Sequence, residues 1–150
     1  MTLRVEVATS ATAEMLAALH VLVPLLSSSA APLSESELED IVSSKATTLL
    51  LAYDNDAIVG TLSLAIFRTP SGLRAWIEDV IVDQAARGSG VGRALVSAAI
   101  TYAENEHVRT IDLTSRPSRA SAHRLYERMG FVVRETNNYR LDIEGLEKQT

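Results

Sequence analysis

The sequence predicts a single α/β domain in which helices flank a mixed sheet. Apolar residues recur at helical spacing in some segments and alternate in others, and the two kinds of segment are interleaved along the chain. Tight turns separate three of the expected strands, which favours antiparallel neighbours. The chain has 150 residues, 47% hydrophobic and 22% charged, which is enough for one core and too few for two ordinary domains. We therefore expect residues 1–150 to form one domain.

The first half of the chain is expected to hold a strand, two helices and a three-strand meander. Leu3–Ala8 alternates weakly, as a strand does, and a hydroxyl side chain at position 9, 10 or 12 is placed to cap the next helix. A second helix is predicted to begin near Ser34, because Glu37 completes a capping box, and to end near Lys45. The meander is expected at Thr48–Tyr53, Ala57–Phe67 and Leu73–Val82.

The second half is expected to alternate helices and strands. A helix over Val91–Glu106 precedes a strand at Thr110–Thr114. The next helix, Arg119–Met129, is closed by Gly130, and a strand pair is expected over Phe131–Leu141. The buried stripe of the Val91–Glu106 helix is predicted to consist of Leu95, Ala98, Ala99 and Tyr102.

Composition disfavours several classes of function. A net charge of -5 argues against nucleic-acid binding, which usually concentrates Lys and Arg on one face, and suits a cationic substrate. The sequence has no cysteine and only three histidines, so neither disulfides nor a metal centre is expected. The apolar run Met15–Leu26 is too short to span a bilayer, and Glu14 stands where a signal peptide carries positive charge. We expect a cytoplasmic protein that does not bind membranes.

The segment Trp76–Arg93 runs from an apolar strand into a glycine-rich turn that opens a helix. Glycines at 88, 90 and 92 let the backbone approach a ligand closely, while the N–H groups at the positive end of the helix dipole face an anion. Arg87 and Arg93 add positive charge at the same place. This arrangement predicts a pyrophosphate site.

The spacing within the loop separates the known phosphate-binding designs. A nucleotide P-loop ends in Gly-Lys followed by Ser or Thr, whereas this chain has Gly92-Arg93-Ala94. The dinucleotide fingerprint needs a third glycine where this chain has Arg93, although Asp112 lies at a suitable distance downstream. The loop resembles instead the coenzyme A motif of the GNAT superfamily of N-acetyltransferases, Arg/Gln-x-x-Gly-x-Gly/Ala, which is met by Arg87, Gly90 and Gly92.

A second motif supports the same resemblance. Ala122–Phe131 is similar to the GNAT signature Ala-x-x-Leu-Tyr-x-x-x-Gly-Phe, in which the tyrosine, here Tyr126, lies beside the coenzyme A sulfur. The two motifs occur in the family's order, separated by one helix and one strand, and the resemblance covers essentially Leu3 to Leu141. It implies a GNAT-type fold with a mostly antiparallel central sheet, and acetyl-CoA as co-substrate.

The resemblance also implies a catalytic pair. Acetyl transfer to an amine needs a base for the substrate ammonium and an acid for the departing thiolate. Glu78 stands where many members carry a catalytic glutamate and is the expected base, and Tyr126 is the expected acid. The competing interpretations are a solvated or salt-bridged strand residue for Glu78 and a core residue for Tyr126.

Alternation along the strand bears on the choice of base. Strict period-two spacing puts Glu78 on one face with Val80 and Val82, and Asp79 on the other face with Ile81. Only one of the two carboxylates then faces the site. Because a bulge in this strand of the family can shift the count, Asp79 stays an alternative base.

Cofactor contacts are implied for three groups of residues. The main chain of Val80, Ile81 and Val82 is expected to bind the pantetheine arm as an added strand would. Many members carry an asparagine seven residues before the tyrosine, where this chain has Arg119; Ser118 beside it is either a contact or, as we expect, the helix N-cap. The expected pyrophosphate loop consists of Arg87, Gly88, Ser89, Gly90, Val91, Gly92 and Arg93.

The expected function is transfer of an acetyl group from acetyl-CoA to a primary amine of a small molecule or peptide. The alternative is a GNAT-fold protein that binds coenzyme A as a sensor or subunit without transfer, and turnover on a panel of amines separates the two. By resemblance, acceptor choice lies in the loops Ser27–Ser36 and Thr136–Tyr139. A homodimer is compatible with the resemblance.

Overall fold

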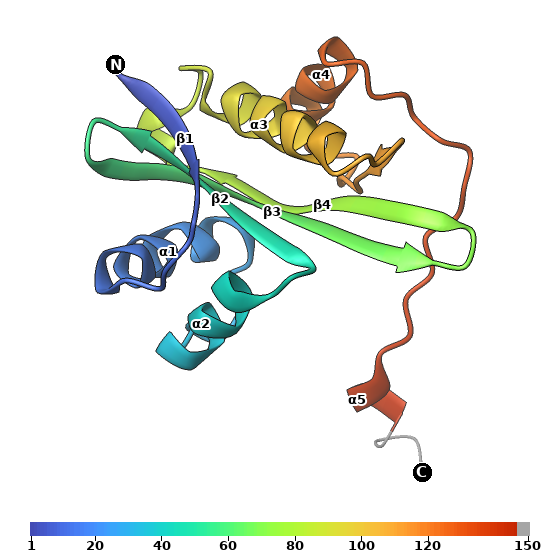
Figure 1. Ribbon diagram of the computed structural model, residues 1–150, viewed down its shortest axis with the longest axis horizontal. Helices are drawn as coiled ribbons and strands as arrows, with labels where there is room; N and C mark the ends of the chain where they lie inside the picture. The colour runs from blue at the N-terminus through green and yellow to red at the C-terminus, as the bar shows by residue number, and fades with distance from the viewer. Residues whose placement is uncertain (147–150) are drawn as a thin grey trace. The chain divides into compact units, whose positions relative to one another are not determined.

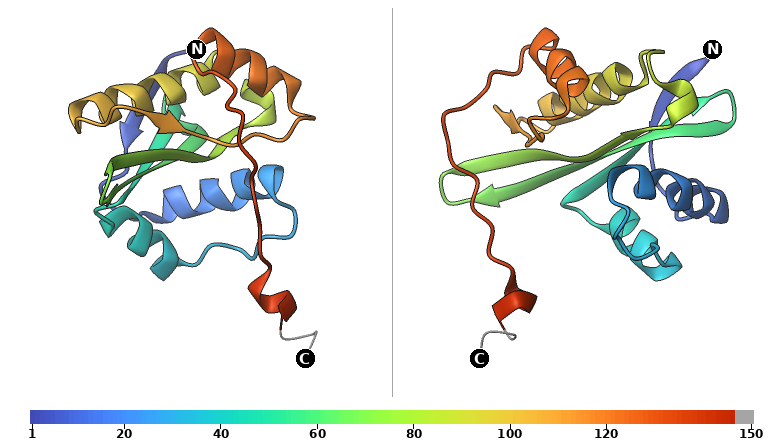
Figure 2. Two further views of the ribbon diagram at one scale, coloured as in Figure 1. Left: turned by 90° about the vertical axis from the view of Figure 1, so that its right-hand side faces the viewer. Right: turned by 180° about the vertical axis from the view of Figure 1, so that it is seen from behind.

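The computed structural model describes residues 1–146. It divides into two compact units, Met1–Arg116 and the residues from Pro117 on, and each is described by itself. The first unit is a five-stranded sheet in the order β1-β2-β3-β4-β5. Figures 1 and 2 show helices α1 and α2 on one face of this sheet and α3 on the other.

The sheet is mixed and mostly antiparallel, as expected. β1 (Leu3–Val7), β2 (Thr47–Asp54), β3 (Ala57–Thr69) and β4 (Gly72–Val82) are antiparallel neighbours, and β5 (Ile111–Asp112) runs parallel to β4. Tight turns at the predicted places join the three strands of the meander. β5 is shorter than the predicted strand, and it pairs only with Ala75 and Trp76.

The two helices below the sheet are capped by side chains. The Oγ1 atom of Thr12 accepts a hydrogen bond from the N–H of Met15 (3.1 Å) at the start of α1 (Ala13–Leu26). At the start of α2 (Glu35–Ser43), Ser34 Oγ accepts from Glu37 N–H (3.1 Å) and Glu37 Oε1 accepts from Ser34 N–H (3.0 Å). The predicted capping box is therefore confirmed, and its backbone hydrogen bond lowers the pKa of Glu37.

Each face of the sheet has its own core. Leu19 of α1 and Leu38 of α2 pack in a cluster with Leu51 of β2 on one face. On the other face, α3 (Val91–Asn105) buries Leu95 and Ala99, as predicted, whereas the predicted Ala98 and Tyr102 are only half-buried.

Gly60 of β3 lets the first turn of α3 approach the sheet closely. A Cβ atom at this position would lie 2.8 Å from the Cγ1 atom of Val91 and 3.1 Å from the main-chain oxygen of Ile81. A side chain cannot fit there without displacing its neighbours. The distance between the start of α3 and the end of β4 therefore depends on the absence of a side chain at Gly60.

The second unit contains α4 (Ala120–Arg128) and a short helix, α5 (Ile143–Leu146). After α4, Gly130 adopts φ +97° and donates to Glu127 O, while Phe131 N–H donates to Tyr126 O at 3.0 Å. These two bonds form a Schellman motif, which confirms the predicted closure by glycine.

The strand pair predicted over Phe131–Leu141 is wrong. The segment forms no strand, and Val133 and Tyr139 are 83% and 86% exposed. An isolated hairpin is marginal in water and needs a packed face to persist. Strand-forming composition without such a face does not produce a strand here.

Candidate functional site

β4 changes its pairing halfway along. Ala75 and Trp76 pair with β3 on one side and with β5 on the other. Beyond them β4 pairs with β3 alone, as far as Val82 opposite Gly60. Within the first unit, the side of β4 away from β3 is therefore open along residues 77–82.

A β-bulge at Asp79 lies at the start of this open stretch. Glu78 is opposite Ser63 and Ile81 is opposite Thr61, so β4 carries one more residue than β3 between the two pairs. Asp79 has φ +50°, a left-handed conformation that Asp tolerates better than most residues with a side chain. β4 therefore contains a bulge of the kind that, in the sequence analysis, kept Asp79 as an alternative base to Glu78.

The bulge changes which residues share a face of the sheet. Counting from the paired residues on either side, Glu78 and Ile81 lie on the face covered by α1 and α2, whereas Val80 and Val82 lie on the α3 face. The strict alternation that grouped Glu78 with Val80 and Val82 is wrong, because it counts the bulged residue as an ordinary step of the pleat. Glu78 and Asp79 are both exposed.

The N–H and C=O groups at the end of β4 point alternately to β3 and to the open side of the strand. The N–H of Asp83 donates to Val59 O of β3 at 2.8 Å. Since the bonding groups of an antiparallel strand alternate between its two sides, Ile81 also directs its groups to β3. Val80 and Val82 direct theirs to the open side. Two of the three residues predicted to bind a pantetheine arm thus have main-chain groups in position for an added strand.

A glycine-rich loop follows β4. It starts with a 3-10 turn, η1 (Gln84–Ala86), in which Ala86 is buried. Gly88 and Gly90 have φ +80° and +85°, and a Cβ atom at either position would meet nothing within 4 Å. Glycine therefore serves the backbone conformation at these positions, and space lies open beside the loop.

Helix α3 begins without a side-chain cap. Its N-cap is Gly90, and the first helical bond runs from Ala94 N–H to Gly90 O at 3.0 Å. The N–H groups of Val91, Gly92 and Arg93 precede that bond and have no partner inside the helix. Together with the helix dipole, they form a start that can bind an anion.

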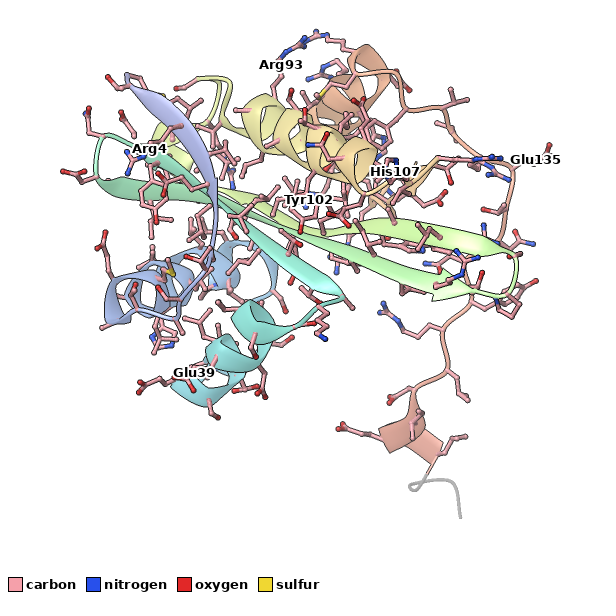
Figure 3. All side chains as sticks on the ribbon, in the orientation of Figure 1. Arg4, Glu39, Arg93, Tyr102, His107 and Glu135 are labelled. Atoms are coloured by element: carbon pink, nitrogen blue, oxygen red, sulfur yellow. The ribbon has the colours of Figure 1, made fainter. Side chains whose placement is uncertain are left out.

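Exposed polar side chains surround this helix start. Arg87, Ser89 and Arg93 are all exposed, and Arg93 projects from the side of α3 away from the sheet (Figure 3). Within residues 1–146, neither guanidinium forms an ion pair with a carboxylate. Both positive charges are therefore available to a phosphate group.

Two properties of Tyr126, in the second unit, bear on its role: the packing of its ring and the pKa of its phenol. Its ring packs edge-on against Phe131, with centroids 5.8 Å apart, which is the apolar contact that accompanies a Schellman motif. Burial raises the pKa of the Tyr126 phenol, and the nearby Arg119 charge opposes that effect more weakly. The phenol is therefore protonated at neutral pH and holds a proton that it can donate.

The N-cap of α4 is Arg119, and no side chain caps the helix. The expectation that Ser118 fills this role is therefore wrong, because the helix begins one residue later than a cap at Ser118 requires. Both residues are exposed, so neither is committed to a core contact.

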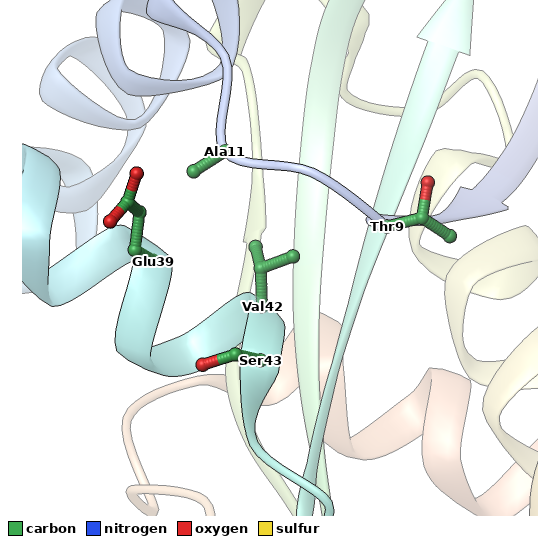
Figure 4. A pocket seen from close by; sticks show the side chains of 5 residues that line it. All are labelled: Thr9, Ala11, Glu39, Val42 and Ser43. Atoms are coloured by element: carbon green, nitrogen blue, oxygen red, sulfur yellow. The ribbon is translucent and has the colours of Figure 1, made fainter.

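A separate hollow of about 260 Å³ lies between the β1–α1 connection and α2 (Figure 4). Its lining contains one charged group, the carboxylate of Glu39. The described part of the chain, residues 1–146, holds no group of three or more His, Asp or Glu side chains suited to a metal ion. The same residues contain no helix long and apolar enough to cross a membrane.

Comparison with known proteins identifies the family to which the chain is similar. The family model described as "Acetyltransferase (GNAT) family" matches residues 15–131. An uncharacterized N-acetyltransferase of Methanocaldococcus jannaschii is 36% identical over 61 residues, which are 41% of this chain and 27% of that protein. The matched region thus spans about a quarter of this curated relative.

Solved structures share the fold over nearly the whole chain. A Bacillus halodurans protein described as a transcriptional regulator is 30% identical, and a Trypanosoma brucei acetyltransferase is 28% identical; both have a TM-score of 0.75 and match 95% of this chain and 100% of their own. The enzyme AAC(6')-Iy, in complex with the bisubstrate analogue CoA-S-monomethyl-acetylneamine, is 15% identical with a TM-score of 0.78, over 95% of this chain and 99% of its own. At that identity, the last comparison establishes the fold alone.

Proposed function

Because the chain belongs to the GNAT acetyltransferase family, whose members use acetyl-CoA, we propose that it moves an acetyl group to a primary amine of a small molecule or peptide. The family and its relatives make the protein an N-acetyltransferase. The observation that carries the finer proposal is the open, bulged end of β4, which the glycine-rich loop connects to the uncapped start of α3. A cytoplasmic location is part of this proposal.

We further propose that residues 1–150 act as one GNAT domain. The family model runs without interruption across the boundary between the two compact units at Arg116 and Pro117. Both signature motifs, the loop at Arg87–Arg93 and the helix end at Ala122–Phe131, lie inside the matched residues.

The residues of the first unit suit acetyl-CoA, which supplies an acetyl group activated as a thioester. The open main-chain groups of Val80 and Val82 are proposed to bind the pantetheine arm, with Ile81 fixing the strand to β3. The loop is proposed to bind the pyrophosphate through the N–H groups at the start of α3 and through Arg87 and Arg93. Ser118 and Arg119 remain proposed contacts of the second unit.

Glu78 is the proposed base, with Asp79 as the alternative. Glu78 is an exposed carboxylate on the strand residue that immediately precedes the bulge. A base at this point lies beside the main-chain groups proposed to align the pantetheine arm. It would take a proton from the acceptor ammonium, directly or through a water molecule, and leave a neutral amine as nucleophile.

Tyr126 is the proposed acid. The neutral amine attacks the thioester carbonyl, a C–N bond forms and the C–S bond breaks, and the departing sulfur takes the proton of the Tyr126 phenol. Its raised pKa keeps that proton in place until a thiolate develops. The newly bonded nitrogen then releases its extra proton to solvent as the neutral amide forms, and the Tyr126 phenolate regains a proton from solvent.

The acceptor is proposed to be a cationic amine, since the chain carries a net charge of -5. The proposal is tested by following the release of free thiol from acetyl-CoA across polyamines, aminoglycosides, amino acids and peptides with a free amino terminus. Turnover on at least one class is expected. Binding of acetyl-CoA without turnover on any amine would favour a coenzyme A sensor instead, and the absence of binding would contradict both functions.

Substituting the proposed base gives the sharpest catalytic test. Glu78→Gln keeps the side-chain shape and is expected to lower kcat by about 100-fold or more, because a positioned base contributes about 10²–10⁴ in rate. Affinity for acetyl-CoA should stay unchanged. Asp79→Asn is the matched control, and a loss of rate in that variant alone would make Asp79 the base.

Tyr126→Phe removes the hydroxyl but keeps the ring that packs on Phe131. The chemical step is expected to slow by about 100-fold. A thioester with a more acidic thiol needs less help from an acid, so the defect should shrink on such a substrate. Equal defects on both thioesters would leave Tyr126 with a packing role only.

A further inference from the structure

β1 is an edge strand with one bonded neighbour in the first unit. In the strand order of the sheet it stands at the end, beside β2 alone. Figure 1 shows β1 at the edge of the sheet, with no other strand of the first unit on its side away from β2. An exposed strand edge is a template for pairing with another strand.

The hydrogen-bonding groups of β1 alternate between β2 and this open edge. Ala8 N–H donates to Leu49 O (2.9 Å), and Thr2 O accepts from Asn55 N–H (3.0 Å). Even-numbered residues therefore bond to β2. The N–H and C=O groups of the three odd-numbered residues, Leu3, Val5 and Val7, point to the open side.

The side chains of β1 also separate into two kinds. Those of the odd-numbered residues are apolar and lie on the α3 face, where Val5 and Val7 line a groove of about 480 Å³ beside α3. Val7 is 41% exposed. On the other face, Arg4 and Glu6 form an exposed ion pair of 3.0 Å, and Arg4 lies over the Tyr53 ring.

We propose that β1 pairs with β1 of a second copy of this chain, antiparallel and about a two-fold axis at Val5. In this register Val5 faces its own equivalent and Leu3 faces Val7, so each facing pair of odd-numbered residues can exchange both N–H···O bonds. Apolar side chains then meet on the α3 face. On the other face, Arg4 of each chain stands opposite Glu6 of its partner.

Charge complementarity selects this register over its neighbours. A shift by two residues in one direction puts Arg4 opposite its own equivalent, and a shift in the other direction puts Glu6 opposite its own equivalent. Like charges directly opposite each other destabilise a strand pair, whereas opposite charges stabilise it. A shift by one residue faces the open groups of one strand with groups already bonded to β2.

The segment Leu3–Val7 is thus self-complementary in its backbone, its apolar face and its charges, as a two-fold interface requires. Pairing joins the two sheets into one and places the two grooves beside α3 on the same face of the joined sheet. Five residues a side make a small interface, so we expect a dimer that dissociates on dilution.

Reversing one charge at a time tests the register. Arg4→Glu gives two carboxylates on the strand and Glu6→Arg gives two cations, so each variant alone is expected to be monomeric, with the dimer dissociation constant raised at least about tenfold. An equal mixture of the two variants should form a heterodimer, and the double variant Arg4→Glu/Glu6→Arg should again form a homodimer. Sedimentation over a range of concentrations measures all four samples.

Glu39→Arg on α2 is the matched control, because it changes the same charge away from β1 and should leave the dimer intact. The proposal is overturned by a wild-type protein that stays monomeric at its highest soluble concentration. It is overturned equally by single variants that dimerise like wild type, or by a mixture that does not associate.

A measurement on the wild-type protein guards against variants that fail to fold. The amide hydrogens of Leu3, Val5 and Val7 face the open edge, so they should exchange slowly in concentrated solution and quickly after dilution. The amides of Arg4 and Glu6 bond to β2 and should be protected in both. Exchange that is equally fast for the three edge amides at every concentration would overturn the proposal.

Discussion

Helices α2 and α3 begin in opposite ways. At α2, Ser34 and Glu37 satisfy N–H groups with their side chains in a complete capping box. At α3, the N-cap is Gly90, which has no side chain, and no cap hydrogen bond forms. Both starts carry the same unsatisfied N–H groups in principle, so the difference lies in what satisfies them.

The comparison separates a structural helix start from one that is proposed to bind a ligand. A side-chain cap stabilises a helix by about 1 kcal/mol relative to alanine. Helix α3 forms no cap hydrogen bond, and just before its start Gly88 and Gly90 adopt left-handed conformations beside open space. A ligand anion can supply the missing partner. Since α4 also begins without a side-chain cap, the missing cap of α3 supports the proposed anion site only together with the glycine-rich loop that precedes it.

The largest effect is expected from Gly90→Val. A residue with a side chain at φ +85° is strained by about 1–2 kcal/mol, and its side chain would occupy the open space beside the loop. We expect acetyl-CoA to bind at least about 100-fold more weakly by calorimetry. Gly72→Val is the control, because Gly72 also has positive φ and open surroundings but lies in a hairpin turn; it should lower stability alone. Unchanged affinity of Gly90→Val for acetyl-CoA would contradict the proposal that the start of α3 binds the cofactor.

A smaller effect is expected from Arg93→Ala. Losing one charged contact to a phosphate should weaken coenzyme A binding by about tenfold, and the loss should diminish at high salt. Pantetheine, which lacks the pyrophosphate, should bind the variant and the wild type equally. Arg68→Ala removes an exposed charge from β3 as the control. Equal weakening for pantetheine would show that Arg93 acts on the fold and not on the phosphates.

Ser34→Ala should show the reverse pattern. Loss of the cap is expected to cost about 1 kcal/mol in the free energy of unfolding, or about 2–4 °C in Tm, with coenzyme A affinity unchanged. Thermal unfolding and calorimetry on the same samples measure both quantities. A change in affinity with no change in Tm would contradict the structural role of this helix start.

The smallest effect concerns pH. The pKa of Glu37 is lowered from 4.5 by its hydrogen bonds to Ser34. The carboxylate therefore stabilises the fold above that pH, and the contribution is lost as the pH falls through the folded-state pKa. Glu37→Gln keeps an acceptor but loses the charge, so its stability should fall below that of wild type at neutral pH and match it in acid. A stability difference that is the same at both pH values would assign the effect to packing.

Local features of the fold could be predicted from the sequence. The capping box at Ser34 and the closure of α4 by Gly130 each depend on residues a few positions apart, and the structure confirms both. The glycine loop belongs to the same class, since its φ values demand glycine wherever the rest of the chain lies.

Features that depend on distant partners could not be predicted in this way. The bulge at Asp79 is a mismatch between β4 and β3, which a count along β4 alone cannot detect. A carboxylate able to adopt positive φ directly after Glu78 was the only local signal. The strand pair over Phe131–Leu141 failed for the same reason, because strand propensity says nothing about whether a partner is present.

Gly60 adds a consequence for engineering. It lies on β3, beneath the first turn of α3, where a single methyl group would press on Val91 and on the Ile81 carbonyl. A library of variants that changes only the exposed loop would therefore leave the distance between α3 and the sheet unchanged. Position 60 therefore offers an indirect means of adjusting the distance between the end of β4 and the start of α3, where the cofactor is proposed to bind, through a residue outside the loop.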